Sequence, residues 1–458
     1  MYDEHLPIFT LSALPEPDKL PRVAVKFIQR HEPEVEYCSK LEAYYRGKQK
    51  ILDREKGGDL SNNRLVCNHA KYIADFTAAY LIGEPVVYLA DYDISPLTNA
   101  LKAADAATQD IDLAHDDAIF GTSFELIYTD ENAEVRLAKV SPRESFVVYD
   151  DTVQHNPLFG VQYYPIYDES GTKTGYKGTI STALYTQDMI LTAGKDIKTL
   201  GEPTAHFFGK VPLDEIWNNA ERMGDFETVM SLMDAYNTLQ SDRVNDKEQF
   251  VNALLVIKGE VLGDDDEERE STYDSIKRHG VMTLGEGSDA SYLTRQLDED
   301  KTEVLSKSIS HDIHKFSCVP DMSDENFAGN VSGVAMEYKI LALERITKFK
   351  ERYFSEGLRY RLECIANFLA AKGGALIPVK DIDMQFTHAL PKDEAALAQE
   401  INSLSGRVSQ ETLIARLPFV KDPKAEIKAV AKEKQESAKL MVDSMFHADE
   451  HTKINDNR

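Results

Sequence analysis

Hydrophobic and polar residues alternate along this chain with two different periods. Up to residue 120, apolar side chains recur every three to four positions, which predicts amphipathic helices at residues 34–56, 64–82 and 96–120. From Thr122 to Leu191 the period changes to two, which predicts short strands of an antiparallel β region. After Leu191 the spacing becomes helical again, with helices at 226–250, 300–316, 392–404, 410–416 and 423–445. Two further short strands are predicted at 86–89, between the first helices, and at 382–386. The pattern predicts an α+β protein.

One further helix is much longer than the others and begins near Val334. Its apolar stripe comprises Val334, Tyr338, Leu341, Ile346, Phe349, Tyr353, Leu358, Leu362, Ile365 and Leu369. At about 1.5 Å per residue it reaches about 55 Å, so it either crosses a large domain or stands beside copies of itself. Gly357 lies inside it and predicts a bend, because glycine weakens a helix.

The stretch that precedes this helix has no hydrophobic period. Residues 321–333 are polar, and they include Gly329 and Gly333, which are free to adopt positive φ. This predicts an ordered or switchable loop. At the other end of the chain, residues 1–30 contain four prolines and are predicted to form an extended arm.

Composition places the chain among folded proteins. It has 458 residues, of which 42% are hydrophobic and 28% charged. Its longest apolar runs fall short of the roughly 18 residues that a membrane-spanning helix needs, and its N-terminus lacks a signal-peptide pattern, so we expect a cytoplasmic protein without membrane contact. Its four cysteines are widely spaced and are expected to be buried, reduced thiols: Cys38, Cys67, Cys318 and Cys364.

The charge balance argues against tight binding to nucleic acid. The chain has 52 Lys and Arg against 78 Asp and Glu, a net charge of −26. Binding driven by counterion release requires clustered cations, so the chain as a whole repels DNA. A simpler interpretation is that the charge serves solubility.

Motifs for enzymatic chemistry are missing from the sequence. Gly194-Lys195 and Gly209-Lys210 lack the rest of a phosphate-binding loop, and residues 329–333 place serine one position too late for a nucleophile elbow. The loop from Asp321 lacks the glycine and glutamate of a calcium loop. His311 and His314 supply half a metal site at most, with a surface or interface role as the alternative. We therefore predict no catalytic residue, no metal and no cofactor.

Several segments together resemble the portal proteins of tailed double-stranded DNA bacteriophages. Four of them are the run Asn63–Ile73, Gly83–Val86, Asn219–Asp225 and the pair Asp234–Asn237 with Ser241–Arg243. The most specific is Val319–Asp321 with Asn326–Ala335 and Lys350–Phe354. The resemblance covers residues 30 to 445, with the segments in the same order throughout.

The resemblance implies a portal fold with defined parts. These are an N-terminal arm (1–30), an antiparallel β/α wing (31–225), a helical stem (226–256 and 300–320), a small clip (257–299), a tunnel loop (321–333), a long kinked wing and crown helix (334–373), and a helical crown with its tail (374–458). It implies a dodecameric ring at one capsid vertex, through which DNA is packaged and ejected.

Two sets of site residues follow from the resemblance. The tunnel loop would face the DNA through Ser323, Asp324, Glu325, Asn326, Phe327, Asn330 and Val331. The clip would dock the terminase or an adaptor through Asp264, Asp265, Asp266, Glu267, Glu268 and Arg278, although an isolated acidic run is more often a solvated loop.

The implied partners are other copies of the chain, the terminase large subunit, a head–tail adaptor, the scaffold and the major capsid protein, with double-stranded DNA passing non-specifically. The implied location is the virion, with the host cytoplasm during assembly. Two alternatives remain: a different head–tail adaptor or head-assembly protein, and an enzyme, for which the residues assemble no site.

Overall fold

The structure is a computed structural model. It describes residues 9–56, 61–192, 197–251, 254–258, 270, 274, 289–293, 299–322, 333–388, 399, 401–417, 420 and 423–437. The chain divides into two compact units. The first comprises Met1–Glu42, Ile73–Glu227 and Cys318–Arg458, and the second comprises Ala43–Tyr72 and Thr228–Ser317.

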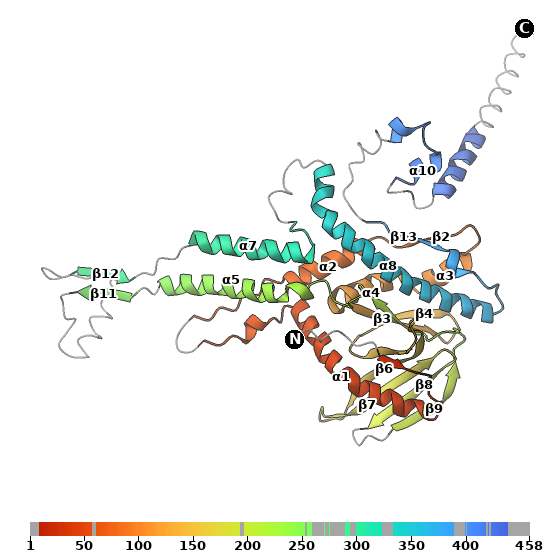
Figure 1. The fold of residues 1–458 in the computed structure, drawn as a ribbon, viewed down its shortest axis with the longest axis horizontal. Helices are drawn as coiled ribbons and strands as arrows, with labels where there is room; N and C mark the ends of the chain where they lie inside the picture. The colour runs from red at the N-terminus through yellow and green to blue at the C-terminus, as the bar shows by residue number, and fades with distance from the viewer. Residues whose placement is uncertain are drawn as a thin grey trace, which may run out of the picture. The chain divides into compact units, whose positions relative to one another are not determined.

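The first unit contains the predicted β region, which forms two sheets (Figure 1). A six-stranded sheet has the order β1-β5-β6-β7-β8-β9, with β1 parallel to β5 and the other pairs antiparallel. Its strands are β1 (Phe9–Leu11), β5 (Ser145–Asp150), β6 (Pro157–Tyr167), β7 (Lys173–Thr182), β8 (Tyr185–Thr192) and β9 (Ile197–Ala205). The second sheet has the order β10-β3-β4, formed by β10 (Leu213–Trp217), β3 (Thr122–Thr129) and β4 (Val135–Val140). Period-two alternation predicted six of these strands and missed β1, β9 and β10.

Helix α1 (Leu20–Tyr45) covers one face of the larger sheet. Leu20, Ala24 and Phe27 are buried against strand residues such as Phe159 and Ile180. The prediction of an extended arm through residue 30 is therefore wrong from Leu20 onward, as is a helix beginning only at residue 34. The first turn of a helix tolerates proline, because its N–H groups have no intrahelical partner, and Pro21 lies in that turn.

Two helices replace the single one predicted for residues 96–120. They are α3 (Ser95–Ala103) and α4 (Ala106–Phe120). Asp105 between them has φ 52°, a left-handed conformation that no helix can continue through. Three shorter elements complete this part of the unit: strand β2 (Val87–Leu89), which pairs with β13 (Asp383–Gln385), and the 3₁₀ turn η4 (Val379–Asp381).

The long helix is confirmed as α8 (Gly333–Ala371), a continuous helix of 39 residues. Gly357 serves close packing: a Cβ there would lie 2.5 Å from Cγ1 of Ile216 in β10. Figure 1 shows the helix changing direction near its N-terminal end, whereas Gly357 lies in its C-terminal half. The glycine is thus explained by its contact with the small sheet.

The buried stripe of α8 differs from the predicted one. Leu358, Leu362 and Ile365 are buried as expected, but Phe349 is 60% exposed. Lys350 and Arg361 point inward instead, at 4% and 0% exposure. The Lys350 ammonium donates to Asp225 at 2.5 Å, and Arg361 lies between two buried carboxylates, donating to Glu125 at 2.6 Å and pairing with Asp110 at 2.7 Å. Hydropathy cannot anticipate charged residues that are buried because they are paired.

The second unit is mainly helical. It contains the 3₁₀ turn η1 (Lys50–Asp53), α5 (Met230–Val251), β11 (Leu254–Lys258), β12 (Asp289–Leu293) and α7 (Glu299–Ser317). Helix α5 ends at Val251, and the apolar run after it continues as β11, which pairs antiparallel with β12. Helix α2 (His69–Ile82) and the 3₁₀ turn η2 (Glu227–Val229) are shared across the boundary between the units along the chain.

Toward the C-terminus the described residues form short helical segments joined by turns. They include residues 401–404, α10 (Gln410–Ile414) and residues 423–437. Ser409 caps α10, because its side chain accepts a hydrogen bond from the Thr412 N–H. None of the four cysteines forms a disulfide; Cys38 and Cys364 are buried and the other two half-buried. Among the described residues, no helix is long and apolar enough to cross a membrane.

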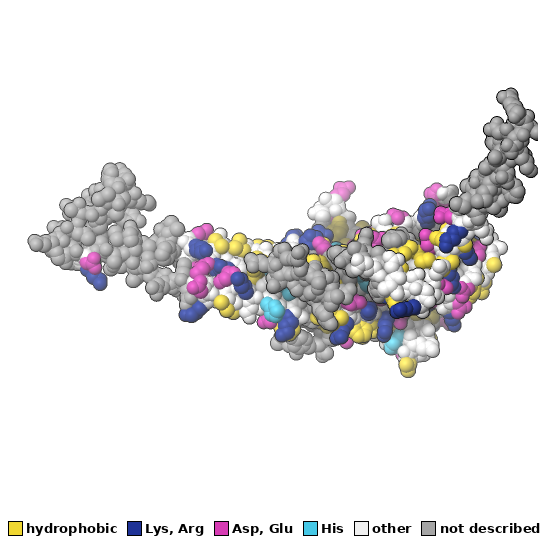
Figure 2. All heavy atoms as spheres, turned by 90° about the horizontal axis from the view of Figure 1, so that it is seen from above, with side chains coloured by type: hydrophobic (Ala, Val, Ile, Leu, Met, Phe, Trp, Pro, Cys, Tyr) yellow, Lys and Arg dark blue, Asp and Glu magenta, His cyan; other side chains and the backbone are white. Residues whose placement is uncertain are grey.

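The acidic excess is dispersed where it can be seen. On the face shown in Figure 2, Lys and Arg side chains lie close to Asp and Glu side chains. Side chains of opposite charge are therefore interspersed over the described part of this face.

Candidate functional site in the helical unit

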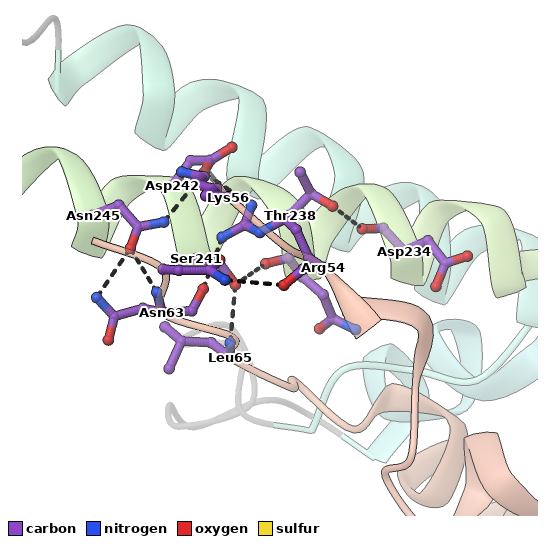
Figure 3. A network of polar contacts seen from close by, with 11 residues as sticks. Arg54, Lys56, Asn63, Leu65, Asp234, Thr238, Ser241, Asp242 and Asn245 are labelled. Atoms are coloured by element: carbon purple, nitrogen blue, oxygen red, sulfur yellow. Dashed lines mark hydrogen bonds and ion pairs between the residues drawn. The ribbon is translucent and has the colours of Figure 1, made fainter. Parts of the chain in front are cut away.

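Two of the segments that carry the portal resemblance, Asn63–Ile73 and the pair on α5, meet on one face of α5. Residues 61–68, here called the belt, run as an extended chain alongside α5, and three α5 side chains bind them (Figure 3). The N–H groups of Asn63, Leu65 and Cys67 donate in turn to Asn245 Oδ1 at 2.7 Å, Ser241 Oγ at 2.9 Å and Asn237 Oδ1 at 2.8 Å.

The spacing of this ladder follows from the geometry of the two elements. Two residues of extended chain advance about 6.6 Å, and four residues of α-helix advance about 6.0 Å. Every second belt N–H therefore meets every fourth α5 side chain, with the belt antiparallel to the helix. Asn237, Ser241 and Asn245 serve as a side-chain substitute for a neighbouring strand.

The carboxylate of Asp242, on α5, binds the residues that precede the belt. Asp242 accepts from Arg54 at 2.9 Å and from Lys56 at 3.1 Å. Arg54 also donates to the Asn63 carbonyl at 2.7 Å, and Asn62 donates to the Arg54 carbonyl at 3.0 Å. Partial burial raises the pKa of Asp242, but the hydrogen bond from Lys56 and the charge of Arg54 outweigh burial and hold the pKa below its usual value.

The inward face of α5 is consequently polar. Asn237, Ser241 and Asn245 are 0%, 0% and 1% exposed. Val229 and Met233 are buried as the hydrophobic pattern predicts, whereas Tyr236, Leu239 and Val244, also predicted inward, are half-buried. The polar positions belong inside because each finds a backbone partner.

The contact between α5 and α7 is polar as well. Gln240 donates to Ser306 at 2.7 Å, and Arg243 pairs with Glu299 at 2.9 Å and with Glu303 at 3.1 Å. Ile313 is a buried apolar residue of α7, at 0% exposure. The two helices are thus joined mainly by hydrogen bonds and ion pairs.

One side of α7, here called its apolar face, exposes three large apolar side chains. Val304, Leu305 and Phe316 are 69%, 51% and 58% exposed. Large apolar side chains are usually inside, so the exposure of these three, among exposed lysines such as Lys301 and Lys315, is unusual. Such a face is typical of a surface that another protein covers.

Both predicted sets of site residues lie outside the described residues. This holds for the tunnel-loop residues Ser323, Asp324, Glu325, Asn326, Phe327, Asn330 and Val331. It holds equally for the clip residues Asp264, Asp265, Asp266, Glu267, Glu268 and Arg278. The structure describes the elements on either side of them. Helix α7 ends at Ser317 and α8 begins at Gly333, on either side of the loop. Strand β11 precedes the clip residues and β12 follows them.

The two histidines of α7 have different surroundings. His311 is exposed, whereas the His314 ring packs edge-on against the rings of His69 and Tyr72, each at 5.6 Å. Within the described ranges, no group of three or more potential ligands could hold a metal ion. His314 therefore contributes to an aromatic cluster.

Sequence reasoning missed the role of the belt. It assigned residues 64–68 to a helix, but α2 begins at His69. A signal was present: Asn237, Ser241 and Asn245 recur every fourth residue, which places three polar side chains on one helix face. Nothing in that spacing identifies an extended chain as the partner, because the partner residues lie 170 to 182 positions away in the sequence.

Comparisons with known proteins identify the family. The model of the family "Phage portal protein, SPP1 Gp6-like" matches residues 25–440. The portal protein of Bacillus phage SPP1 is 26% identical over 444 residues, covering 91% of this chain and 86% of the relative. The portal protein of Clostridium phage phiCD119 is 22% identical over 438 residues, covering 88% and 93%.

Among solved structures, a chain from the neck of an empty GTA particle computed with C6 symmetry matches with a TM-score of 0.42. It is 16% identical, and the match covers 78% of this chain and 87% of that one. Because the family model spans most of the sequence, this chain belongs to the SPP1 Gp6-like family of phage portal proteins.

Proposed function

We propose that copies of this chain close into a dodecameric ring around a channel through which double-stranded DNA is packaged and later ejected. As a portal protein, the chain is a virion component at a capsid vertex. In such a ring, a neighbouring copy of the chain would cover the apolar face of α7. The exposure of Val304, Leu305 and Phe316 is the observation that carries the proposal, because covering these side chains with a neighbouring copy would remove apolar surface from water.

We propose that the chain has the parts that the family resemblance implies. The wing would comprise residues 31–225 and the stem residues 226–256 and 300–320, which include the α5 and α7 pair. The clip would comprise residues 257–299, consistent with the β11–β12 pair there. The long helix (334–373) and crown (374–458) would follow the tunnel loop.

The α7 face can be tested by assembly. Leu305→Asp places a charge on the apolar face, and we expect ring formation to be weakened at least tenfold, because burying an unpaired carboxylate is costly. Leu305→Met is the matched control, since it keeps the face apolar. Analytical ultracentrifugation measures both, and undiminished rings in Leu305→Asp would remove α7 from the interface.

Residues 321–333 are proposed as the tunnel loop. Its side chains would contact phosphates weakly, without reading bases, so that the duplex slides. Deleting Phe327–Asn330 should impair DNA packaging while rings form normally. A packaging assay with purified components measures this, and full packaging by the deleted ring would exclude the loop from the mechanism.

The acidic run is proposed as the docking site for a basic surface of the terminase or adaptor. Opposite charges favour fast, salt-sensitive encounter. Reversing Asp264–Glu268 to lysines should weaken terminase binding at low salt, whereas reversing the exposed Glu131 and Glu134 of the β3–β4 turn should not. Equal affinities of the two variants would contradict the assignment.

A further inference from the structure

After α8, the side chain of His388 joins the chain to two helices. His388 is the last residue of the described stretch 333–388 and belongs to the first unit. Its Nδ1 lies 2.9 Å from the Tyr80 carbonyl oxygen on α2, and its Nε2 lies 2.5 Å from Glu351 Oε1 on α8. Its ring stacks on that of Tyr80, with centroids 4.8 Å apart and an interplanar angle of 8°.

Both hydrogen-bonding partners of the His388 imidazole, the Tyr80 carbonyl and the Glu351 carboxylate, can only accept hydrogen bonds. A carbonyl oxygen and a carboxylate have no proton to give, and a neutral imidazole carries one N–H. The two contacts are therefore satisfied together only when both ring nitrogens are protonated. The geometry describes an imidazolium held by two acceptors.

The charges around the ring favour the same state. Glu351 and Glu344 face it from α8, Glu344 being also paired with the largely exposed Lys348 at 3.2 Å, and the Tyr80 ring faces it from α2. Burial lowers the pKa of His388, but the hydrogen bonds to Glu351 and Tyr80 and the two carboxylate charges outweigh burial and raise the pKa above its usual value.

We propose that His388 is a pH-sensitive latch that fastens the chain to α2 and α8 as an imidazolium and releases it when the ring becomes neutral. Before the latch, β13 pairs with β2, and Phe386 packs edge-on against Phe354 at 6.4 Å. Release thus leaves Phe386 and β13 as the contacts that hold this part of the stretch 333–388. The residues from 399 onward follow this point in the chain.

The direction of the pH dependence follows from proton linkage. A histidine whose folded pKa is raised stabilises the latched state fully below its ordinary pKa near 6.5, and that stabilisation is lost as pH rises through the raised value. The latch is closed in mildly acidic solution and opens as pH rises through the raised pKa of His388.

Limited trypsin digestion of the assembled protein tests the latch. The rate of cleavage C-terminal to His388 is followed by mass spectrometry from pH 6 to pH 9 and normalised at each pH to a denatured sample. We expect the normalised rate to rise about tenfold, as expected for losing a charge-assisted hydrogen bond, with a midpoint above pH 6.5.

Three variants distinguish the latch from a merely structural contact. Glu351→Gln keeps an acceptor but removes the charge, so its midpoint should move to lower pH. His388→Gln should be cleaved at the high rate at every pH. His155→Gln, in the β5–β6 turn, is the matched control and should follow the wild type. A flat wild-type profile, an unmoved midpoint in Glu351→Gln, or a pH-dependent His388→Gln would each overturn the proposal.

Discussion

At the scale of residues, the fold depends on polar groups that are buried. His31 and Glu34 lie together beneath the larger sheet, with 3.7 Å between Nε2 and Oε2. Burial lowers the pKa of His31 to about 4 and raises that of Glu34 to about 8. Arg222 and Arg30 oppose the shift of Glu34 without cancelling it. Both side chains are therefore neutral in the folded protein near pH 7.

These two shifts predict opposite pH slopes. Between pH 4.5 and 6.5 they offset one another, because unfolding binds a proton at His31 and releases one at Glu34. Between pH 6.5 and 8 only Glu34 contributes, so the free energy of unfolding should fall by up to about 1.4 kcal/mol per pH unit. Urea unfolding of wild type and Glu34→Gln measures this, and the variant should lack that part of the fall. Parallel curves would contradict the assignment.

The α5 ladder gives a second prediction at this scale. Ser241→Ala removes the acceptor of the Leu65 N–H, and hydrogen exchange in residues 61–68 should accelerate about tenfold, as expected for losing roughly 1.4 kcal/mol. Thr238→Ala is the matched control, because Thr238 is exposed on the same helix. Unchanged exchange in Ser241→Ala would show that the belt does not need the ladder.

At the scale of elements, hydrophobic period predicted most helices and strands but not how they pack. The period-two strands and α7 appear where expected, although β3 and β5 prove to be buried on both faces. The predicted α8 stripe was wrong at Phe349, and the predicted face of α5 was only partly correct, because Lys350, Arg361 and Asn237 are buried by partners distant in sequence. The candidate loop and clip were reached by resemblance alone, and their residues lie outside the described ranges.

The contact between α8 and the small sheet predicts that replacing Gly357 by alanine destabilises the fold. Gly357→Ala improves helix propensity by about 1 kcal/mol, yet its Cβ would lie 2.5 Å from Ile216 Cγ1. We expect a net destabilisation of about 1–3 kcal/mol, as for overpacked cores. Combining it with Ile216→Ala should show favourable coupling in urea unfolding. Additive effects would mean that the two positions do not meet.

At the scale of the whole molecule, the acidic surplus suits a conduit. A channel for a polyanion must not hold it, and a net charge of −26 per chain weakens the attraction to phosphate. The apolar face of α7 supplies a reason for copies to associate despite their like charge. We therefore expect neighbouring copies to cover the exposed apolar side chains of each subunit.

Electron microscopy of the purified full-length protein tests this central claim most directly. Images recorded under conditions that favour assembly should show closed rings with an axial opening wide enough for a double helix. Compact single particles without a central opening, under the same conditions, would contradict it.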